Sequence, residues 1–384
     1  MPVRVIVAGA IAHAPIHGGG NTWAFLQYVL GFRRLGCDVL YVEHIDAKDC
    51  IDAHWQPAPF AASANAATFR ALLARHGLHD GASLLLRDGE EAVGLSRQDV
   101  QAWADGADLF VNLSGRFHIH EIMRAVRRRV YVDLDPGFTQ LWQARYGADM
   151  NLAGHDAYVS VGLNLGRGDC RVPTLGLPWR TICPPVVRAE WRSLDAVGAA
   201  YTTVADWRGY APIEWEGIWY KQKSDEFVRL IELPRRTPCA LEICLAIHPD
   251  EPDLPRLRAH GWRLSEPGVH AADSDAYRDY VRRSRGEFSV AKHGYVVGRT
   301  GWVSDRTACY LAAGRPAVVQ DTGLRPHLPV GEGLLVFDGI DDAVRALDAV
   351  ERDYARHARA AEALAARYFD SDRVLTELLD LAGV

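Results

Sequence analysis

The chain has 384 residues, 48% of them hydrophobic and 24% charged, and a formal net charge of −6 at pH 7. This length and composition fit two α/β domains with sizeable cores and exclude a disordered chain. The negative charge argues against non-specific binding to nucleic acid or membranes, so we expect no nucleic-acid partner and no membrane span. Seven scattered cysteines indicate reduced thiols. We expect a cytoplasmic protein that is a monomer or a homodimer.

The first half alternates short apolar runs with segments of helical periodicity. Residues 3–9 predict a buried strand, residues 13–21 a loop with three consecutive glycines, and residues 22–35 a helix that Gly36 ends. The same criteria give the remaining elements of this half, namely strands at 38–43, 83–86, 109–113, 130–134 and 158–161 and helices at 66–76 and 119–127. Such alternation indicates a parallel sheet that is covered on both faces.

The second half repeats this α/β pattern after a proline-rich stretch, 171–185, which we interpret as the connection between two domains. The expected elements are strands at 201–207, 240–247, 261–264, 287–291, 316–320 and 333–337 and helices at 224–233, 275–283, 305–313, 341–364 and 372–381. The whole chain therefore predicts two Rossmann-like halves.

One stretch near the C-terminus has the strongest functional signal. Residues 301–305, Gly-Trp-Val-Ser-Asp, predict a loop that leads into a helix capped by Ser304 or Asp305. The free N–H groups of a helix N-terminus suit a phosphate. Asp321 and Thr322 follow the next strand, where ligands bind in open α/β sheets. We therefore predict a diphosphate at the helix and sugar hydroxyls at the strand end.

The two halves, the Gly-rich first loop and the Gly-x-x-Ser helix start followed by Ala-Gly-x-Pro-x-Val-Val resemble the GT-B glycosyltransferases, most firmly at 5–42 and 287–323. The resemblance implies an α/β GT-B fold with an acceptor domain at 1–195, a nucleotide-sugar domain at 196–368 and a crossover helix at 369–384. It also implies a metal-independent enzyme without a cofactor. Such an enzyme moves a sugar from a nucleotide diphosphate, by default UDP, to a small-molecule acceptor.

The resemblance leaves the stereochemical outcome open. Gly301 and Cys309 occupy the positions of two glutamates that retaining GT-B enzymes often carry. Residues 301–304 instead look like the Gly-Trp-Asn-Ser of inverting plant-type enzymes. The position of the catalytic histidine of those enzymes holds Asn21 in this chain. Both inversion and retention therefore remain possible.

A donor diphosphate requires cations, because charge-assisted hydrogen bonds are about twice as strong as neutral ones. Arg208 follows the first strand of the second half and Lys221 precedes its first helix, where retaining GT-B enzymes place an Arg and a Lys. Lys292 lies in a polar loop at a strand end, and Trp262 lies where the superfamily holds its nucleobase. The predicted donor-binding residues are Gly19, Gly20, Arg208, Lys221, Trp262, Lys292, Gly301, Trp302, Ser304, Asp305, Asp321 and Thr322.

Transfer to a hydroxyl group also needs a general base. The candidates lie in loops that follow strands of the first half. We predict that the catalytic residues are His13, His17 and Asp133, and that Asn21, His118 and Asp135 lie on the acceptor side. Asp133 and Asp135 also form the Asp-x-Asp motif with which GT-A glycosyltransferases bind a metal ion. The second Rossmann-like half argues against that fold, and we expect no metal.

Other functions fit parts of the same pattern. A sugar-nucleotide epimerase or hydrolase of the same fold would need no acceptor, and a non-catalytic partner that binds nucleotide sugars would show no turnover. A dinucleotide oxidoreductase is the weakest alternative, because the first loop lacks GxGxxG and only Glu43 stands at the end of the second strand.

Overall fold

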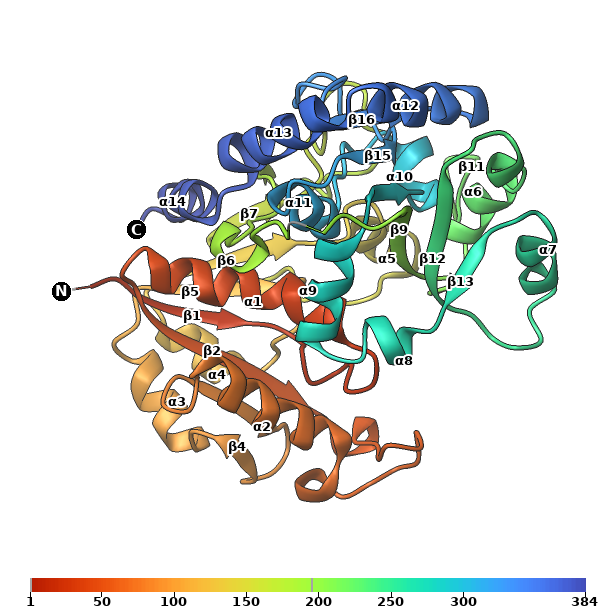
Figure 1. Cartoon of the computed structure of the whole chain (residues 1–384). Coiled ribbons are helices and arrows are strands. Elements are labelled where there is room, and N and C mark those ends of the chain that lie inside the picture. Colours follow the sequence, from red (N-terminus) through yellow and green to blue (C-terminus); the bar gives the residue numbers. More distant parts are fainter. Residues whose placement is uncertain (1, 195) are drawn as a thin grey trace.

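A computed structural model describes residues 2–194 and 196–384 and contains two parallel sheets with helices around them (Figure 1). The first sheet has the strand order β4-β3-β2-β1-β5-β6-β7-β8, and only β3 and β4 pair antiparallel. Its strands are β1 (Arg4–Ala8), β2 (Asp38–Ile45), β3 (Ala82–Leu86), β4 (Ala92–Gly94), β5 (Leu109–Leu113), β6 (Arg128–Asp133), β7 (Ala157–Ser160) and β8 (Arg180–Thr181).

Helices cover both faces of this sheet and bury its β-branched strands, as in the fully buried strand Val5–Ala8. The α-helices of this half are α1 (Gly19–Arg34), α2 (Ala64–His76), α3 (Arg97–Ala104), α4 (His120–Ala125) and α5 (Phe138–Tyr146). Three short 3₁₀ segments add to them, namely η1 (Ala47–Asp49), η2 (Phe60–Ala62) and η3 (Arg188–Trp191).

The second sheet has six parallel strands in the order β13-β12-β9-β14-β15-β16. They are β9 (Ala200–Asp206), β12 (Ala240–Ala246), β13 (Arg263–Ser265), β14 (Gly286–Ser289), β15 (Ala317–Gln320) and β16 (Leu334–Phe337), and a separate antiparallel hairpin consists of β10 (Ile213–Trp215) and β11 (Ile218–Tyr220). The helical segments are α6 (Lys223–Arg229), η4 (Leu233–Arg235), α7 (Asp253–Ala259), α8 (Pro267–His270), α9 (Ser274–Arg283), α10 (His293–Gly298), α11 (Asp305–Ala312), α12 (Ile340–Arg352), α13 (Tyr354–Leu364), the π-helical η5 (Ala365–Phe369) and α14 (Ser371–Ala382).

Two segments cross between the halves side by side. Val186 N donates to Phe369 O at 2.7 Å, and Ser371 N donates to Val186 O at 3.0 Å. After this crossing, α14 packs against α1 and β6 of the first half, as Figure 1 shows at the C-terminus. The expected domain boundaries, at 195/196 and 368/369, stay predictions.

The structure corrects two expectations about elements. The stretch 171–185 is not a free connection, because it contributes β8 to the first sheet and buries Trp179 against Tyr131. The single helix expected at 341–364 is interrupted at Asp353, whose side chain accepts from Arg356 N and caps α13. Among the residues described, no helix is long and apolar enough to cross a membrane.

Candidate functional site

The carboxyl edges of the two sheets meet around an ion pair that joins the halves. Asp135, just after β6, accepts from Lys292 Nζ at 3.0 Å and from the Tyr210 hydroxyl at 2.8 Å, and it is also hydrogen-bonded to Tyr295. The Lys292 Nζ lies 5.1 Å from the centre of the Phe138 ring, a cation–π distance. The predicted acceptor-side Asp135 and donor-binding Lys292 are therefore brought together. Part of the charge of Lys292 is already compensated.

The loop before α11 forms a second junction between the halves. Leu163 N donates to Gly301 O at 3.3 Å, and Gly301 N donates to Thr322 O at 2.8 Å. Gly301 has a φ of +68°, and a Cβ there would lie 2.8 Å from Asn164 N. The neighbouring Trp302 packs against Tyr295 with ring centres 4.5 Å apart and the ring planes tilted by 34°. The glycine at 301 thus allows the first half of the chain to approach closely. The sequence had suggested that a ligand makes this close approach.

Three predicted donor-binding side chains have internal partners instead. Asp321 accepts from Gly323 N and Leu324 N, and the Thr322 hydroxyl donates to Trp302 O at 2.7 Å. Trp262 is buried in the core, where its Nε1 donates to Ile231 O at 3.0 Å. These contacts leave Trp262 no surface for stacking on a base, and they explain Asp321 and Thr322 as turn-forming residues.

The expected phosphate site at α11 is already capped. Ser304 is buried, and its hydroxyl accepts from Arg306 N at 3.2 Å, which confirms Ser304 as the cap. Asp305 places a carboxylate in the first turn, and burial raises the pKa of that group. Arg306 forms a buried ion pair with Glu287 at 2.8 Å. An anion near this helix would therefore have to share the positive end with Asp305.

Among the cations at the second edge, Lys223 differs from Arg208. Arg208 is held by Glu251 at 3.0 Å and by Asp253 at 3.4 Å. Lys223 begins α6, is half-buried and forms no ion pair or hydrogen bond within residues 2–194 and 196–384. Desolvation, together with the positive charges of Arg306 and Lys292, lowers the pKa of Lys223 to about 7. An unpaired ammonium group in such surroundings is suited to an anion.

Backbone hydrogen bonds explain why the lysines gather here. His293 N donates to Gln222 O at 3.2 Å, and Gly294 N donates to Lys221 O at 3.1 Å. The start of α6 therefore lies beside the start of α10, so that Lys223 and Lys292 share one end of the sheet. The predicted Lys221 is half-buried in the same segment.

Histidines occupy the corresponding edge of the first sheet. His13 is exposed in the loop after β1, and its Nε2 lies 2.8 Å from the carbonyl oxygen of His44. Because a carbonyl only accepts, Nε2 must carry the proton, and Nδ1 is left with a free lone pair. His118, after β5, donates its backbone N–H to Nε2 of His44 at 2.9 Å. Burial, followed by the charge of Arg87, lowers the pKa of His44 to about 3 and also that of His118.

Asp133 does not face the histidines as a free base. Its buried carboxylate accepts hydrogen bonds from Thr139, Gln140 and Ser160, at distances of 2.8 to 2.9 Å, and from the backbone of Asp135. Burial raises the pKa of this group. Its role is to fix the turn after β6. In the described part of the chain, no group of three or more His, Cys, Asp or Glu side chains is arranged to hold a metal ion.

The Gly-rich loop contacts α9 of the second half rather than an open cleft. Gly19 N donates to Ala271 O at 3.0 Å, and a Cβ at Gly19 would lie 2.2 Å from Asp273 O. Gly20 faces the Tyr277 ring in the same way. His17 is exposed with its ring next to α8, and Asn21 donates from its side chain to Ala10 O at 2.9 Å. The glycines at 19 and 20 therefore let the halves approach.

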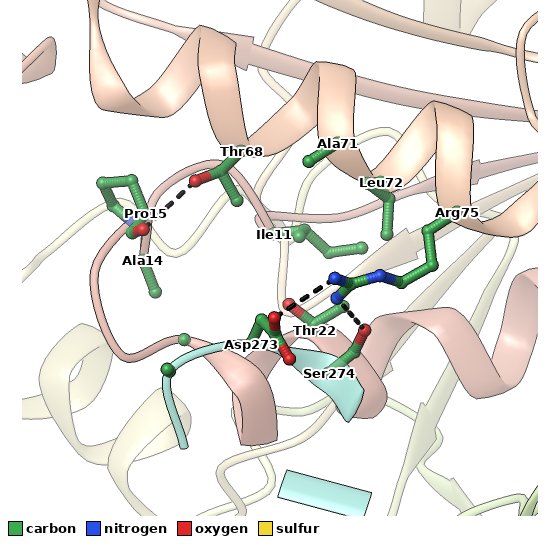
Figure 2. A pocket seen from close by; sticks show the side chains of 12 residues that line it. Ile11, Ala14, Pro15, Thr22, Thr68, Ala71, Leu72, Arg75, Asp273 and Ser274 are labelled. Carbon is green, nitrogen blue, oxygen red and sulfur yellow. Dashed lines mark hydrogen bonds and ion pairs between the residues drawn. The ribbon is translucent and has the colours of Figure 1, made fainter. Parts of the chain in front are cut away.

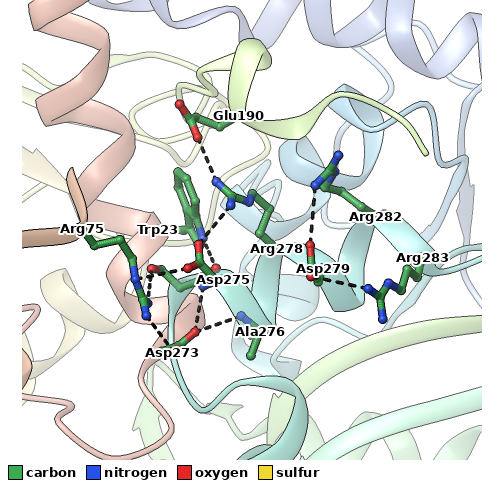
Figure 3. A network of polar contacts seen from close by, with 11 residues as sticks. Trp23, Arg75, Glu190, Asp273, Asp275, Ala276, Arg278, Asp279, Arg282 and Arg283 are labelled. Carbon is green, nitrogen blue, oxygen red and sulfur yellow. Dashed lines mark hydrogen bonds and ion pairs between the residues drawn. The ribbon is translucent and has the colours of Figure 1, made fainter. Parts of the chain in front are cut away.

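A polar network closes this side of the molecule (Figure 3). Arg75 on α2 pairs with Asp273 and Asp275, each at 3.2 Å, and donates to the Ser274 hydroxyl at 3.3 Å. Trp23 Nε1 donates to Ser274 O at 2.7 Å. We call Arg75, Asp273, Ser274 and Asp275 the α2–α9 clamp. Figure 2 shows Arg75, Asp273 and Ser274 of the clamp beside a small pocket of about 110 Å³ between α1, α2 and the loop before α9.

Sequence reasoning missed three of these features. The sequence prediction chose Lys221 rather than Lys223. Lys223 is the better placed of the two, because it begins a helix beside the sheet edge. His44 immediately follows the strand expected at 38–43 and gave no signal of its own; in the structure it belongs to β2. The clamp joins residues about 200 positions apart, so that no local pattern identifies Arg75.

Solved structures resemble this architecture along its whole length, and the fold that they share with it is the GT-B fold. An alpha-glucosyltransferase solved with UDP and a DNA containing an HMU base aligns over 100% of both chains, with a TM-score of 0.58 and 12% identity. Anabaena Alr3699/HepE in complex with UDP aligns over 98% of this chain and 99% of that chain, with a TM-score of 0.55 and 11% identity. The structure of Alr3699/HepE with UDP-glucose has a TM-score of 0.52 at 11% identity and the same coverage.

At such identities the likeness shows the fold, and it confirms the predicted α/β GT-B architecture of this chain. No protein-family model and no curated protein matches the sequence.

Proposed function

We propose that this chain is a glycosyltransferase that takes a sugar from a nucleotide diphosphate, with UDP as the expected nucleotide. The observation that carries the proposal is the ammonium group of Lys223 at the carboxyl edge of the second sheet, which has no partner among the described residues. The fold supports it, because similar structures were solved with UDP or UDP-glucose.

In this proposal Lys223 neutralises the diphosphate as it leaves. Charge on the leaving group grows in the transition state, so a cation fixed beforehand in a desolvated site stabilises the transition state more than the ground state. Lys292 adds a second positive charge close by, and its contact with Asp135 keeps the two edges together. Arg208 reaches a donor only if its ion pair with Glu251 breaks, so we propose that it contributes less than Lys223 to neutralising the diphosphate.

On the acceptor side, we assign the general base to His13. Its Nε2–H bond to the His44 carbonyl fixes the tautomer, which leaves Nδ1 to take the proton of an acceptor hydroxyl. As that oxygen bonds to the anomeric carbon, the bond from this carbon to the diphosphate breaks, and the diphosphate leaves with the electron pair. We favour His13 over His17 because no hydrogen bond among the described residues orients the His17 ring.

We further propose that the reaction needs no metal ion. Asp133 cannot supply the Asp-x-Asp chemistry, because its oxygens already accept hydrogen bonds in a buried position. Activity that persists in excess EDTA would support this, and activity restored only by a divalent cation would contradict it. The acceptor is proposed to be a small molecule, although the alpha-glucosyltransferase above was solved with DNA.

Calorimetric titration with UDP, the other nucleoside diphosphates and NAD tests the donor half directly. We expect selective binding of one diphosphate, and with the matching nucleotide sugar we expect slow release of that diphosphate without any acceptor. Binding of NAD alone would overturn the proposal. Complete turnover to free sugar that no acceptor changes would instead indicate a hydrolase.

A further inference from the structure

Three buried polar atoms at the ends of β2 and β3 have no hydrogen-bond partner in the described part of the chain. They are the Nδ1 of His44, the Oδ1 of Asp46 and the Nε of Arg87. Arg87 N donates to Ile45 O at 3.0 Å, which continues the pairing of the two strands and places Arg87 beside His44 and Asp46. This part of the edge lies next to His13, whose ring contacts the His44 carbonyl. This cluster lies at the same sheet edge as the proposed base, His13, but it takes no part in the proposed proton transfer.

The Arg87–Asp46 pair is close but poorly matched. Its Nε lies 2.9 Å from Asp46 Oδ1, yet the two atoms do not have hydrogen-bond geometry, and the Arg87 side chain donates no hydrogen bond within the described residues. The side chains are 37% and 21% exposed, so their outer atoms are open to a ligand. Charge-assisted donors and acceptors of this kind are rarely left unused unless a ligand or water completes them.

The charges of this cluster select the ligand. Arg87 and Asp46 have opposite charges, and burial keeps His44 uncharged at neutral pH. The exposed ammonium group of Lys48 lies 3.9 Å from the same carboxylate. An anion would face the Asp46 carboxylate, and a cation would face the Arg87 guanidinium. A hydroxyl group satisfies both, because it accepts from the guanidinium while donating to the carboxylate.

Two neighbouring hydroxyls match the two ends of the ion pair. On the basis of the proposed function, we propose that the acceptor is a saccharide, held through adjacent hydroxyl groups by Arg87 and Asp46 so that a further hydroxyl reaches Nδ1 of His13. An apolar aglycone acceptor would leave the charged pair without partners, and binding it would remove water from both groups without replacement.

The test measures UDP release from UDP-glucose in the presence of glucose, galactose, mannose, N-acetylglucosamine, maltose or cellobiose, with p-nitrophenol and quercetin as aglycones without a sugar. We expect at least one saccharide to accelerate release tenfold or more over the rate without acceptor. Arg87→Met and Asp46→Asn should each raise the KM for that saccharide about tenfold, with a much smaller change in kcat and an unchanged Kd for UDP. Lys48→Met is the matched control, since Lys48 is 77% exposed and lies 3.9 Å from the same carboxylate.

Acceleration by the two aglycones alone would overturn the saccharide assignment, as would an unchanged KM in both variants. UDP binding without acceleration by any saccharide of the set would also overturn the saccharide assignment, but it would leave the proposed binding of the nucleotide sugar intact. If the chain bound neither UDP nor UDP-glucose, the proposed function itself would fail. Melting curves and UDP affinity show whether each variant is folded. If Arg87→Met is not folded, Asp46→Asn tests the saccharide assignment.

Discussion

At the carboxyl edge of the first sheet the prominent titratable groups are imidazoles, whereas at the corresponding edge of the second sheet they are ammonium groups. Both edges are built from the ends of parallel strands, so the architecture does not cause the difference. His44 lies under the loops, and its burial lowers its pKa far enough to keep it uncharged. Desolvation lowers the pKa of Lys223 from its usual 10.5 to about 7, so that a large fraction of this side chain is still charged at neutral pH. One edge is therefore suited to proton transfer and the other to a phosphate.

The strongest test of the first edge is His13→Gln. Glutamine keeps a donor for the His44 carbonyl but has no basic nitrogen, so only the proposed proton transfer is lost. We expect kcat for transfer to fall about 100- to 10,000-fold, the usual contribution of a general base, with the Kd for UDP unchanged. His17→Gln, in the same loop, should leave kcat close to that of the parent chain. If the two variants behaved in the opposite way, the base would be His17.

The second edge is tested by Lys223→Met, which keeps most of the length of the side chain without its charge. A hydrogen bond to a charged group contributes about 1.5 to 3 kcal/mol, so the Kd for UDP should rise about 10- to 100-fold in calorimetry. Lys221→Met removes an equal charge two residues earlier and should have a smaller effect. Equal effects of the two substitutions would show a general contribution of positive charge and would remove Lys223 as a specific ligand.

The pH dependence of donor binding sharpens the same point. Below pH 7 Lys223 is charged in the free protein, whereas above pH 7 a growing fraction is neutral and must take up a proton on binding an anion. The Kd for UDP-glucose should therefore rise by up to about tenfold per pH unit from 7 to 9. UDP-glucose is the better probe, because its diphosphate does not titrate in this range. A flat profile in the parent chain, or the same slope in Lys223→Met, would contradict the assignment.

Much of the architecture could be predicted from the sequence, because buried parallel strands are continuous runs of β-branched residues. Thus β5 was expected at its observed bounds, 109–113, and the Ser304 cap was expected from residue type. The short hairpin β10–β11 and α5 were missed, since neither has an extended periodic pattern. The break at Asp353 was missed because the apolar period continues across it.

The candidate site was less predictable, because polar residues at strand ends look alike in sequence whether they bind a ligand or one another. Asp321 and Thr322 follow a strand as expected and Asp133 ends one, yet their side chains are used by neighbouring turns. Asp135 and Lys292 were both expected at the site, but their pairing across it depends on how the halves meet. Tertiary contacts of this kind leave no local periodicity.

The smallest expected effect concerns how firmly the two edges are held together. The α2–α9 clamp joins the halves through ion pairs of Arg75 whose side chains are 36% to 48% exposed. Exposed pairs contribute about 0 to 1 kcal/mol, so Arg75→Met should change the apparent Kd for UDP by less than about fivefold. The change should shrink further in 1 M salt, where the Debye length is about 3 Å. Arg278→Met removes the pairs with Glu190 and Asp275 but leaves Arg75 on α2 in place, so it separates the link between α2 and α9 from other charges on α9. A large, salt-independent loss in Arg75→Met alone would mean that Arg75 contacts the donor. The two edges would then share the binding of the diphosphate, and the division between a proton-transfer edge and a phosphate edge would no longer hold.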